Sequence, residues 1–230
     1  MIRKWEELPD WMQCPEVKVY YDNLVTKTLS LVLKRIFDVV FAILILLLTL
    51  VPMIIIAVII KCESKGPVFY RQERVTAYGL VFRIHKFRTM VNDAERLGSA
   101  VTVGNDGRIT KVGKMIRGLR IDEIPQVIDV LQGNMSFVGT RPEATKYVKE
   151  YTKEMRATLL MPAGITSEAS IRFKDEATLL TGEENIDEAY VKKILPQKMR
   201  YNLESIKKFS FWNDLLTLLR TVAAVLGKEY

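Results

Sequence analysis

The sequence predicts a helix-rich, mixed α/β protein: a single domain attached to one membrane helix. Three observations lead to this prediction. The chain has 230 residues, enough for one domain with a sizeable core. A long apolar run, Ile36 to Ile60, lies towards its N-terminal side. Downstream of that run, short stretches with the composition of strands alternate with amphipathic helical stretches, without internal repeats or low-complexity segments.

These features divide the chain into three parts. Residues 1–33 are expected to form an N-terminal arm or interfacial helix, because tryptophans and tyrosines stand there among mixed charges. Residues 34–61 form the membrane helix, and residues 62–226 form the domain that carries the polar motifs. The last amphipathic stretch, Leu203 to Leu226, either packs on the domain core or lies in the membrane interface.

The apolar run has the length and composition of a membrane helix. Only Asp38, Thr49 and Pro52 interrupt its aliphatic and aromatic residues. A helix over this run would be roughly 37 Å long, enough to cross the hydrocarbon core of a bilayer. The run is too long, and begins too far from Met1, to be the apolar part of a signal peptide, so we expect it to stay in the mature protein.

The flanks of the run favour a helix that enters and leaves the membrane on the same face. Lys34 and Arg35 precede the run and further basic residues follow it, so both ends carry the charge typical of the cytoplasmic side. Pro52 offers a site for a bend, since its ring clashes with the carbonyl four residues earlier. Asp38 lies one turn after Arg35 and is expected to pair with it. The flanks alone leave open a single-pass anchor with a tolerated proline.

The net charge and the kinds of side chain present limit which partners and which kinds of site are possible. The formal net charge of +7 suits an anionic partner, and the candidates are nucleotide phosphate, an acidic lipid surface and nucleic acid. Nucleic acid fits poorly, because the basic residues are dispersed and the apolar run would have no role. With a single histidine, His85, a histidine-rich metal site cannot form, and His85 is expected to be a strand side chain. The two cysteines are not spaced as in a disulfide-bonded framework, which indicates free thiols in a reducing compartment.

The domain is expected to begin with two strands, Val68 to Val75 and Leu80 to Phe87, joined by a turn at Tyr78-Gly79. A helix is expected to start within Val91 to Leu97. Further helices are predicted where helical periodicity ends at a glycine or before a proline. They cover Ile124 to Leu131, Glu143 to Leu160 and, near the end of the chain, Leu203 to Leu226.

The polar motif with the clearest chemistry is the adjacent pair Asp122-Glu123. Pro125 belongs in a first helical turn, so the pair is predicted at or just before a helix N-terminus, where free amide groups also favour a phosphate. An aspartate there is often only a cap, but two carboxylates can divide nucleophilic attack, Mg²⁺ binding and proton transfer between them. Arg141, held in a turn by Pro142, offers its planar fork to phosphate oxygens, or else makes a surface ion pair.

Several motifs follow one another in a specific order. They are Lys34-Arg35-x-x-Asp38, Gly66-Pro67-Val68-Phe69-Tyr70-x-Gln72-x-Arg74, Lys86-Phe87-Arg88-Thr89-Met90, Asp122-Glu123-Ile124-Pro125-Gln126, Gly133-Asn134-Met135-Ser136-Phe137-Val138-Gly139-Thr140-Arg141-Pro142 and Gly164-Ile165-Thr166. Each motif alone is weak, but the ordered set resembles the bacterial sugar transferases, the monotopic phosphoglycosyl transferases, in their minimal catalytic form. The resemblance covers about Leu33 to Leu226.

This resemblance implies a re-entrant helix bent at Pro52, with the catalytic domain on the cytoplasmic face of the bacterial inner membrane. It implies that Asp122 attacks the sugar-linked phosphate of a UDP-sugar, releases UMP and holds a covalent phosphosugar until a polyprenyl phosphate, undecaprenyl phosphate, accepts it. Glu123 would join Asp122 in binding Mg²⁺. The basic residues expected to bind nucleotide or lipid phosphate are Lys86, Arg88 and Arg141. The reaction would begin a lipid-linked glycan for a capsule, exopolysaccharide, O-antigen or glycoprotein.

Three positions depart from the family pattern. Thr140 replaces a usual proline, Asn134 replaces a frequent aspartate, and Ser167 to Ser170 replaces the usual continuation after Gly-Ile-Thr. None of them touches the carboxylate pair. The last departure points to a different sugar, so we expect specificity residues within Pro162 to Asp175.

Two other functions fit the same residues. A membrane-bound, metal-dependent phosphodiesterase or pyrophosphatase would use the carboxylates on water and need no lipid acceptor. A non-catalytic basic membrane scaffold would use Asp122 only as a helix cap. The sequence leaves open which sugar is used, the prenyl chain length, the pathway and whether the chain forms a homo-oligomer.

Overall fold

The computed structural model describes residues 2–92, 94, 106–173, 176–180, 183 and 185–225. The α-helices are α1 (Pro15–Val25), α2 (Thr28–Glu63), α3 (Lys111–Gly118), α4 (Gln126–Gln132), α5 (Thr145–Val148), α6 (Glu168–Arg172), α7 (Glu176–Leu179), α8 (Ile186–Ala189), α9 (Leu195–Lys207) and α10 (Phe211–Val225). The shorter helices are η1 (Trp5–Glu7), η2 (Asp10–Met12), η3 (Ala77–Gly79), η5 (Ile121–Glu123), η6 (Met155–Leu160) and the π-helical η7 (Tyr190–Ile194). The strands are β1 (Phe69–Tyr70), β2 (Glu73–Val75), β3 (Val81–Arg83), β4 (Lys86–Phe87), β5 (Met135–Val138) and β6 (Ala163–Thr166). The helix-rich, mixed α/β class predicted from the sequence is confirmed.

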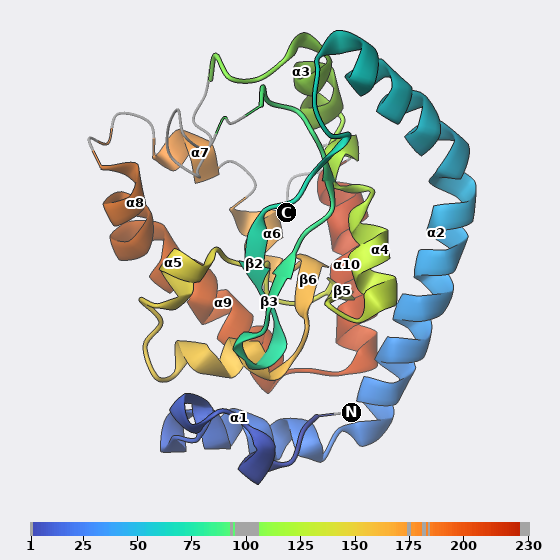
Figure 1. The fold of residues 1–230 in the computed structure, drawn as a ribbon. Helices are drawn as coiled ribbons and strands as arrows, with labels where there is room; N and C mark the ends of the chain where they lie inside the picture. Colours follow the sequence, from blue (N-terminus) through green and yellow to red (C-terminus); the bar gives the residue numbers. More distant parts are fainter. Residues whose placement is uncertain are drawn as a thin grey trace.

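Helix α2 curves along one whole side of the domain (Figure 1). It includes Pro52 without interruption and extends beyond the predicted 34–61 at both ends. One stripe of α2 packs against α3, α4, β5 and α10, whereas much of the rest of its surface exposes leucine, isoleucine and valine. Among the described residues, α2 is the one helix long and apolar enough to cross a membrane, judged by length and composition.

The N-terminal residues pack into the largest hydrophobic core of the domain. Met12, Val17 and Leu24 are fully buried, and they lie in one cluster with residues of η6 and α9. Helix α1 contacts both of those elements, and Figure 1 shows it along the lower edge of the domain. The chain therefore reaches α2 from a segment that is already part of the domain core.

The two predicted strands form an interrupted antiparallel hairpin. β1 pairs with β4, β2 pairs with β3, and unpaired residues separate the two pairs. The turn falls at the predicted Tyr78-Gly79, where both residues have positive φ (60° and 76°), a conformation that suits glycine far better than tyrosine.

A second, parallel strand pair lies in the domain interior. All residues of β5 are buried, and Met135 of β5 is in register with Ala163 of β6. Beyond the pairing, Gly139 and Gly164 bring the two backbones so close that a Cβ at Gly164 would clash with the backbone of Gly139. This contact fixes the start of the turn that leads to Arg141.

Two long helices predicted from periodicity are wrong as single helices. Glu143 to Leu160 contains α5 and then η6, because the Thr152 hydroxyl accepts from the Met155 amide and begins a new turn. The helix predicted from Leu203 splits into α9 and α10, where Ser210 caps the new helix by accepting from the Asn213 amide. Most of the helix start predicted in Val91 to Leu97, together with Leu226, lies outside the described residues.

Candidate active site

The carboxylate pair lies in a tight connection between α3 and α4. Arg120, directly before η5, has a left-handed backbone (φ 55°), a strained conformation for an arginine. η5 carries Asp122 and Glu123, and Pro125 is the N-cap residue of α4. The predicted position just before a helix N-terminus is confirmed, and it is reached through a strained turn that the sequence did not indicate.

Glu123 is held by two basic side chains from distant segments. Lys86 Nζ donates to Glu123 Oε1 at 2.7 Å, and Arg141 donates to both carboxylate oxygens, at 2.5 and 3.3 Å. Burial alone would raise the pKa of Glu123, but Arg141 and Lys86 outweigh burial and hold the pKa well below its usual range. Glu123 is therefore an anion that fixes two cations in place. We call Asp122, Glu123, Lys86 and Arg141 the carboxylate site.

Asp122 differs from its neighbour. Its side chain makes no hydrogen bond or ion pair with another side chain in the part of the chain that the structure describes. Burial and the negative charge of Glu123 raise the pKa of Asp122, while Lys86 and Arg117 act in the opposite direction. The Asp122 carboxylate is thus free to bind a ligand or to attack one.

Two further arginines add positive charge around the carboxylates. Burial lowers the pKa of Arg74. Burial also lowers the pKa of Lys86, and the nearby charges of Arg141 and Arg74 act in the same direction. Arg117 donates to the Thr89 hydroxyl at 2.9 Å and acts on Asp122. Cations outnumber carboxylates here, which suits a ligand with several negative charges, such as a diphosphate. Arg74 was not predicted as a site residue, although it ends one of the sequence motifs.

Arg88 lies apart from this site. Its guanidinium donates to the carbonyls of Ile60, Ser64 and Lys65, where α2 ends. Arg88 is buried, and these bonds satisfy carbonyl groups that the end of a helix leaves without partners. Arg88 thus binds the end of α2 to the domain, and its contact with phosphate stays a prediction.

The basic and acidic residues at the start of the apolar run face the domain. The predicted pairing of Arg35 with Asp38 is wrong. Arg35 instead donates to the carbonyls of Val130 and Leu131, and Asp38 accepts from the Phe137 amide at 3.1 Å.

Lys34, which is 6% exposed, completes this group. It donates to the Val138 carbonyl at 2.6 Å and to Asp214 of α10 at 2.5 Å. We call Lys34, Arg35, Asp38 and Asp214 the anchor cluster, because it joins α2 to α4, β5 and α10.

His85 has a structural environment. It is buried between β3 and β4, its Nδ1 lies 2.8 Å from Asp129, and Arg71 lies 2.6 Å from its Nε2. The Asp129 carboxylate also accepts from the His85 amide. These contacts join the hairpin to α4, which agrees with the prediction that His85 is not a catalytic base.

The carboxylate site has the donors for one kind of metal site. Among the described residues, no cluster of three or more histidine, cysteine or acidic side chains could enclose an ion. Mg²⁺, however, is commonly held by one or two carboxylates together with substrate phosphates and water. Asp122 is free to act as such a ligand, while the oxygens of Glu123 already accept from two cations.

The sequence matches the family model of the bacterial sugar transferases over residues 29–228. The chain is 34% identical over 197 residues to the UDP-N-acetylgalactosamine-undecaprenyl-phosphate N-acetylgalactosaminephosphotransferase of Aeromonas hydrophila. It is also similar to UDP-glucose:undecaprenyl-phosphate glucose-1-phosphate transferases, with 35% identity to that of Caulobacter vibrioides and 36% to that of Escherichia coli. These alignments cover 84%, 85% and 83% of this chain, but 44%, 70% and 39% of the three relatives.

The chain therefore belongs to the bacterial sugar transferase family, as the ordered motifs indicated. Within this family it is similar to transferases that are named for undecaprenyl phosphate and a nucleotide sugar. The long apolar helix α2 is compatible with membrane association.

Proposed function

We propose that this protein transfers a sugar-1-phosphate from a UDP-sugar to undecaprenyl phosphate at the cytoplasmic face of the bacterial inner membrane, releasing UMP. One observation carries the proposal: a free carboxylate, Asp122, lies beside a fixed excess of cations. That combination suits nucleophilic attack on a diphosphate. The names of the relatives supply the substrate classes.

The chemistry divides into two displacements at one phosphorus atom. An oxygen of Asp122 attacks the sugar-linked phosphorus, the bond to the bridging oxygen breaks, and UMP leaves with that oxygen. A phosphate oxygen of undecaprenyl phosphate then attacks the same phosphorus, and the Asp122 carboxylate leaves. Asp122 is regenerated, and the product is a lipid diphosphate sugar.

The other site residues orient and neutralise the phosphates. Lys86 and Arg141 are fixed on Glu123, so their positive charge is already in place when the diphosphate binds. Arg117 stabilises the ionised form of Asp122, which is the form that attacks. Mg²⁺ held by Asp122, Glu123 and the diphosphate would neutralise charge on the phosphate oxygens.

We further propose that α2 is re-entrant and bends at Pro52 within the membrane. Both of its ends are bound to the same domain, which supports this arrangement. At the N-terminal end, α1 is part of the domain core, while at the C-terminal end Arg88 binds carbonyls of α2 and Glu63 accepts from the Val112 amide of α3. A helix with one end on each side of a bilayer could not keep both attachments.

The reaction is tested with purified full-length protein, Mg²⁺, undecaprenyl phosphate and a panel of UDP-sugars. We expect multiple-turnover UMP release from one donor only when the lipid is present, at most one UMP per protein molecule without it, and no release by Asp122→Asn. Repeated turnover to UMP and sugar phosphate without the lipid would instead indicate a hydrolase. Full activity of Asp122→Asn would leave Asp122 as a helix cap and refute the proposed mechanism.

The topology is tested by thiol labelling in sealed inverted and right-side-out membrane vesicles. Cys62 is exposed beside the C-terminal end of α2, and Val25→Cys in a C62S background places a thiol just before its N-terminal end. Both thiols should react with an impermeant reagent in inverted vesicles only. Labelling from opposite faces would rule out the re-entrant arrangement.

A further inference from the structure

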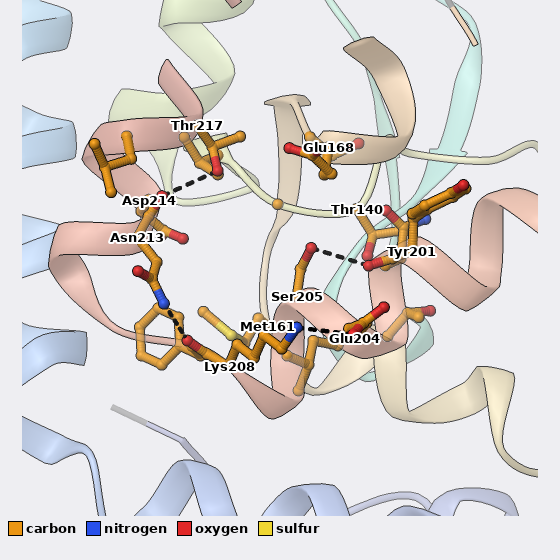
Figure 2. A pocket seen from close by; sticks show the side chains of 18 of the residues that line it. Thr140, Met161, Glu168, Tyr201, Glu204, Ser205, Lys208, Asn213, Asp214 and Thr217 are labelled. Carbon is orange, nitrogen blue, oxygen red and sulfur yellow. Dashed lines mark hydrogen bonds and ion pairs between the residues drawn. The ribbon is translucent and has the colours of Figure 1, made fainter. Parts of the chain in front are cut away.

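A cavity of about 370 Å³ lies between α6, α9 and α10, outside the carboxylate site. Figure 2 shows Lys208 beside Glu204 on its wall, where the two side chains pair at 2.8 Å. Arg172 likewise contacts Glu168 at 3.1 Å. Because these charges neutralise one another, the cavity does not indicate a charged ligand. The polar pair that is linked to the carboxylate site lies elsewhere, between the hairpin and α4.

The hairpin is interrupted at Ile84 and His85, between β3 and β4. The His85 amide is not used in the pairing of the strands and donates instead to Asp129 Oδ2 at 2.8 Å. Asp129 lies in the first turn of α4 and is fully buried. Apolar side chains also pack between the hairpin and α4, but apolar packing has no preferred direction. The hydrogen bonds to Asp129 therefore set the alignment of the hairpin on α4.

The second oxygen of Asp129 fixes the ring of His85. Nδ1 of the ring lies 2.8 Å from Asp129 Oδ1, and on the opposite side the Arg71 guanidinium lies 2.6 Å from Nε2. A guanidinium has donors and no acceptor, so Nε2 must accept from Arg71. The ring is therefore neutral, with its proton on Nδ1, and this proton is donated to Asp129.

Lys86 and Glu123 join the same two parts of the fold a second time. His85 directly precedes Lys86, and Lys86 donates at 2.7 Å to Glu123, just before α4 begins. The side chains of this outer pair are 20% and 24% exposed, whereas those of His85 and Asp129 are 9% and 0% exposed. A lysine has a long, flexible stem, so the place that its ammonium group can reach depends on where its backbone is held. The buried pair therefore limits where Lys86 can lie.

We propose that His85 and Asp129 are positioning residues for Lys86. This inference rests on the proposed transferase function and deepens it. The bonds from the amide and the ring of His85 to Asp129 hold Lys86 against Glu123 before a diphosphate binds, and Arg71 keeps the ring in the tautomer that donates. The ammonium group is then already in place when charge develops on the phosphate. His85 and Asp129 touch neither substrate nor reacting atoms, and their effect passes through Lys86.

Asp129→Asn in the full chain, alone and combined with Lys86→Met, tests whether Asp129 acts through Lys86. Asparagine keeps the shape but offers one accepting oxygen in place of two, so kcat/KM for the UDP-sugar should fall about tenfold. In the Lys86→Met background the same change should alter kcat/KM by less than about twofold, because no lysine is left to position.

Asp38→Asn is the matched control for this pair of measurements. Asp38 is also a buried carboxylate that accepts a backbone amide, but it belongs to the anchor cluster. Its replacement should therefore change kcat/KM by the same factor with and without Lys86. The same behaviour in Asp129→Asn would show a purely structural role and overturn the proposal, as would an unchanged kcat/KM.

His85→Asn and His85→Phe separate the donor from the ring, and they provide the test if Asp129→Asn folds poorly. The asparagine amide nitrogen is attached to Cγ, as Nδ1 is in histidine, so it can donate to Asp129, whereas phenylalanine keeps a ring without a donor. We expect His85→Asn to stay within about threefold of wild type in kcat/KM and His85→Phe to lose about tenfold. Equal losses in the two variants, or the reverse order, would contradict positioning through Asp129.

Two measurements do not depend on turnover. His85 is the one histidine of the chain, so nitrogen NMR with isotope-labelled histidine reports on this ring alone, and a proton on Nε2 instead of Nδ1 would overturn the proposal. The cycle of Asp129→Asn and Lys86→Met can also be measured on the affinity for pyrophosphate with Mg²⁺. A chain that is inactive with every donor yet shows the coupling in this affinity would refute the proposed function and leave the positioning of Lys86 intact. An inactive chain without the coupling would refute both.

Discussion

The carboxylate site and the anchor cluster are built from the same kinds of side chain, but their charges are balanced differently. In the anchor cluster, Lys34 has Asp214 and a carbonyl, Arg35 has two carbonyls, and Asp38 has a backbone amide. In the carboxylate site, two cations contact Glu123, while Asp122 has no such partner in the described structure.

The difference separates structural charge from reactive charge. Groups whose hydrogen-bonding capacity is met within the fold contribute to stability, and removing one partner leaves the other buried and unpaired. Asp122 has a charge that the fold does not neutralise, and a substrate or metal ion can neutralise it. Substitutions in the anchor cluster should therefore mainly lower stability. Substitutions in the carboxylate site should mainly lower activity.

The largest expected effect is the loss of activity in Asp122→Asn, compared with Asp214→Asn. Burial raises the pKa of both aspartates, so the two changes start from similar environments. Asp122→Asn should lower lipid-dependent UMP release by about 10³-fold or more, with an unchanged or higher Tm, because it removes the proposed nucleophile and a partly buried, unpaired charge. Asp214→Asn should lower the Tm and leave the activity of the folded protein within about tenfold of wild type. The opposite pattern would contradict the separation of roles.

Next in size is the loss of stability in Lys34→Met. The side chains of Lys34 and Asp214 are only 7% and 20% exposed, so removing the lysine leaves a buried carboxylate and should lower the free energy of unfolding by about 3–5 kcal/mol. The double variant Lys34→Met/Asp214→Leu should recover part of this loss, as measured by denaturant unfolding in detergent. Lys18→Met, which breaks an exposed pair with Asp22, is the control and should change stability by less than about 1 kcal/mol. Equal losses in the two lysine variants would show that the anchor cluster is not a buried pair in solution.

Arg141→Lys should have a smaller effect, and on activity. Lysine keeps the charge but loses the planar fork that contacts both oxygens of Glu123, so activity should fall by about 10²-fold, while the Tm changes little because Arg141 is partly exposed. Arg83→Lys, in an exposed pair with Glu73, controls for the same exchange at the surface. Wild-type activity in Arg141→Lys would mean that only the charge matters at this position.

Features of the site that depend on neighbouring residues in the chain could be predicted from the sequence. Pro125 and Gly133 fix the ends of α4, so the position of Asp122 and Glu123 just before that helix was predicted correctly. The hairpin was predicted because its apolar pattern and its Tyr78-Gly79 turn are local.

Features that depend on distant partners could not be predicted. Spacing along the helix predicted a pair between Arg35 and Asp38, but carbonyls and an amide of the domain bind both side chains. The hydroxyls of Thr152 and Ser210 begin new helical segments inside stretches that the apolar periodicity alone would read as single helices. The role of Arg88 at the end of α2 depends on a contact between residues far apart in the sequence.

The smallest expected effect is a shift in the pH dependence of kcat/KM. As the proposed nucleophile, Asp122 must be ionised, and its pKa is raised, so activity should fall as the pH drops through a value above about 3.9, the pKa of an ordinary aspartate. Arg117 lowers the pKa of Asp122, so Arg117→Gln should move this acidic limb to higher pH. Arg120→Gln in the exposed neighbouring turn is the control and should leave the limb in place. If Arg117→Gln does not shift the pH at which kcat/KM falls, a group other than Asp122 sets that fall. The contrast between a reactive and a structural aspartate would then rest on the Asp122→Asn result alone.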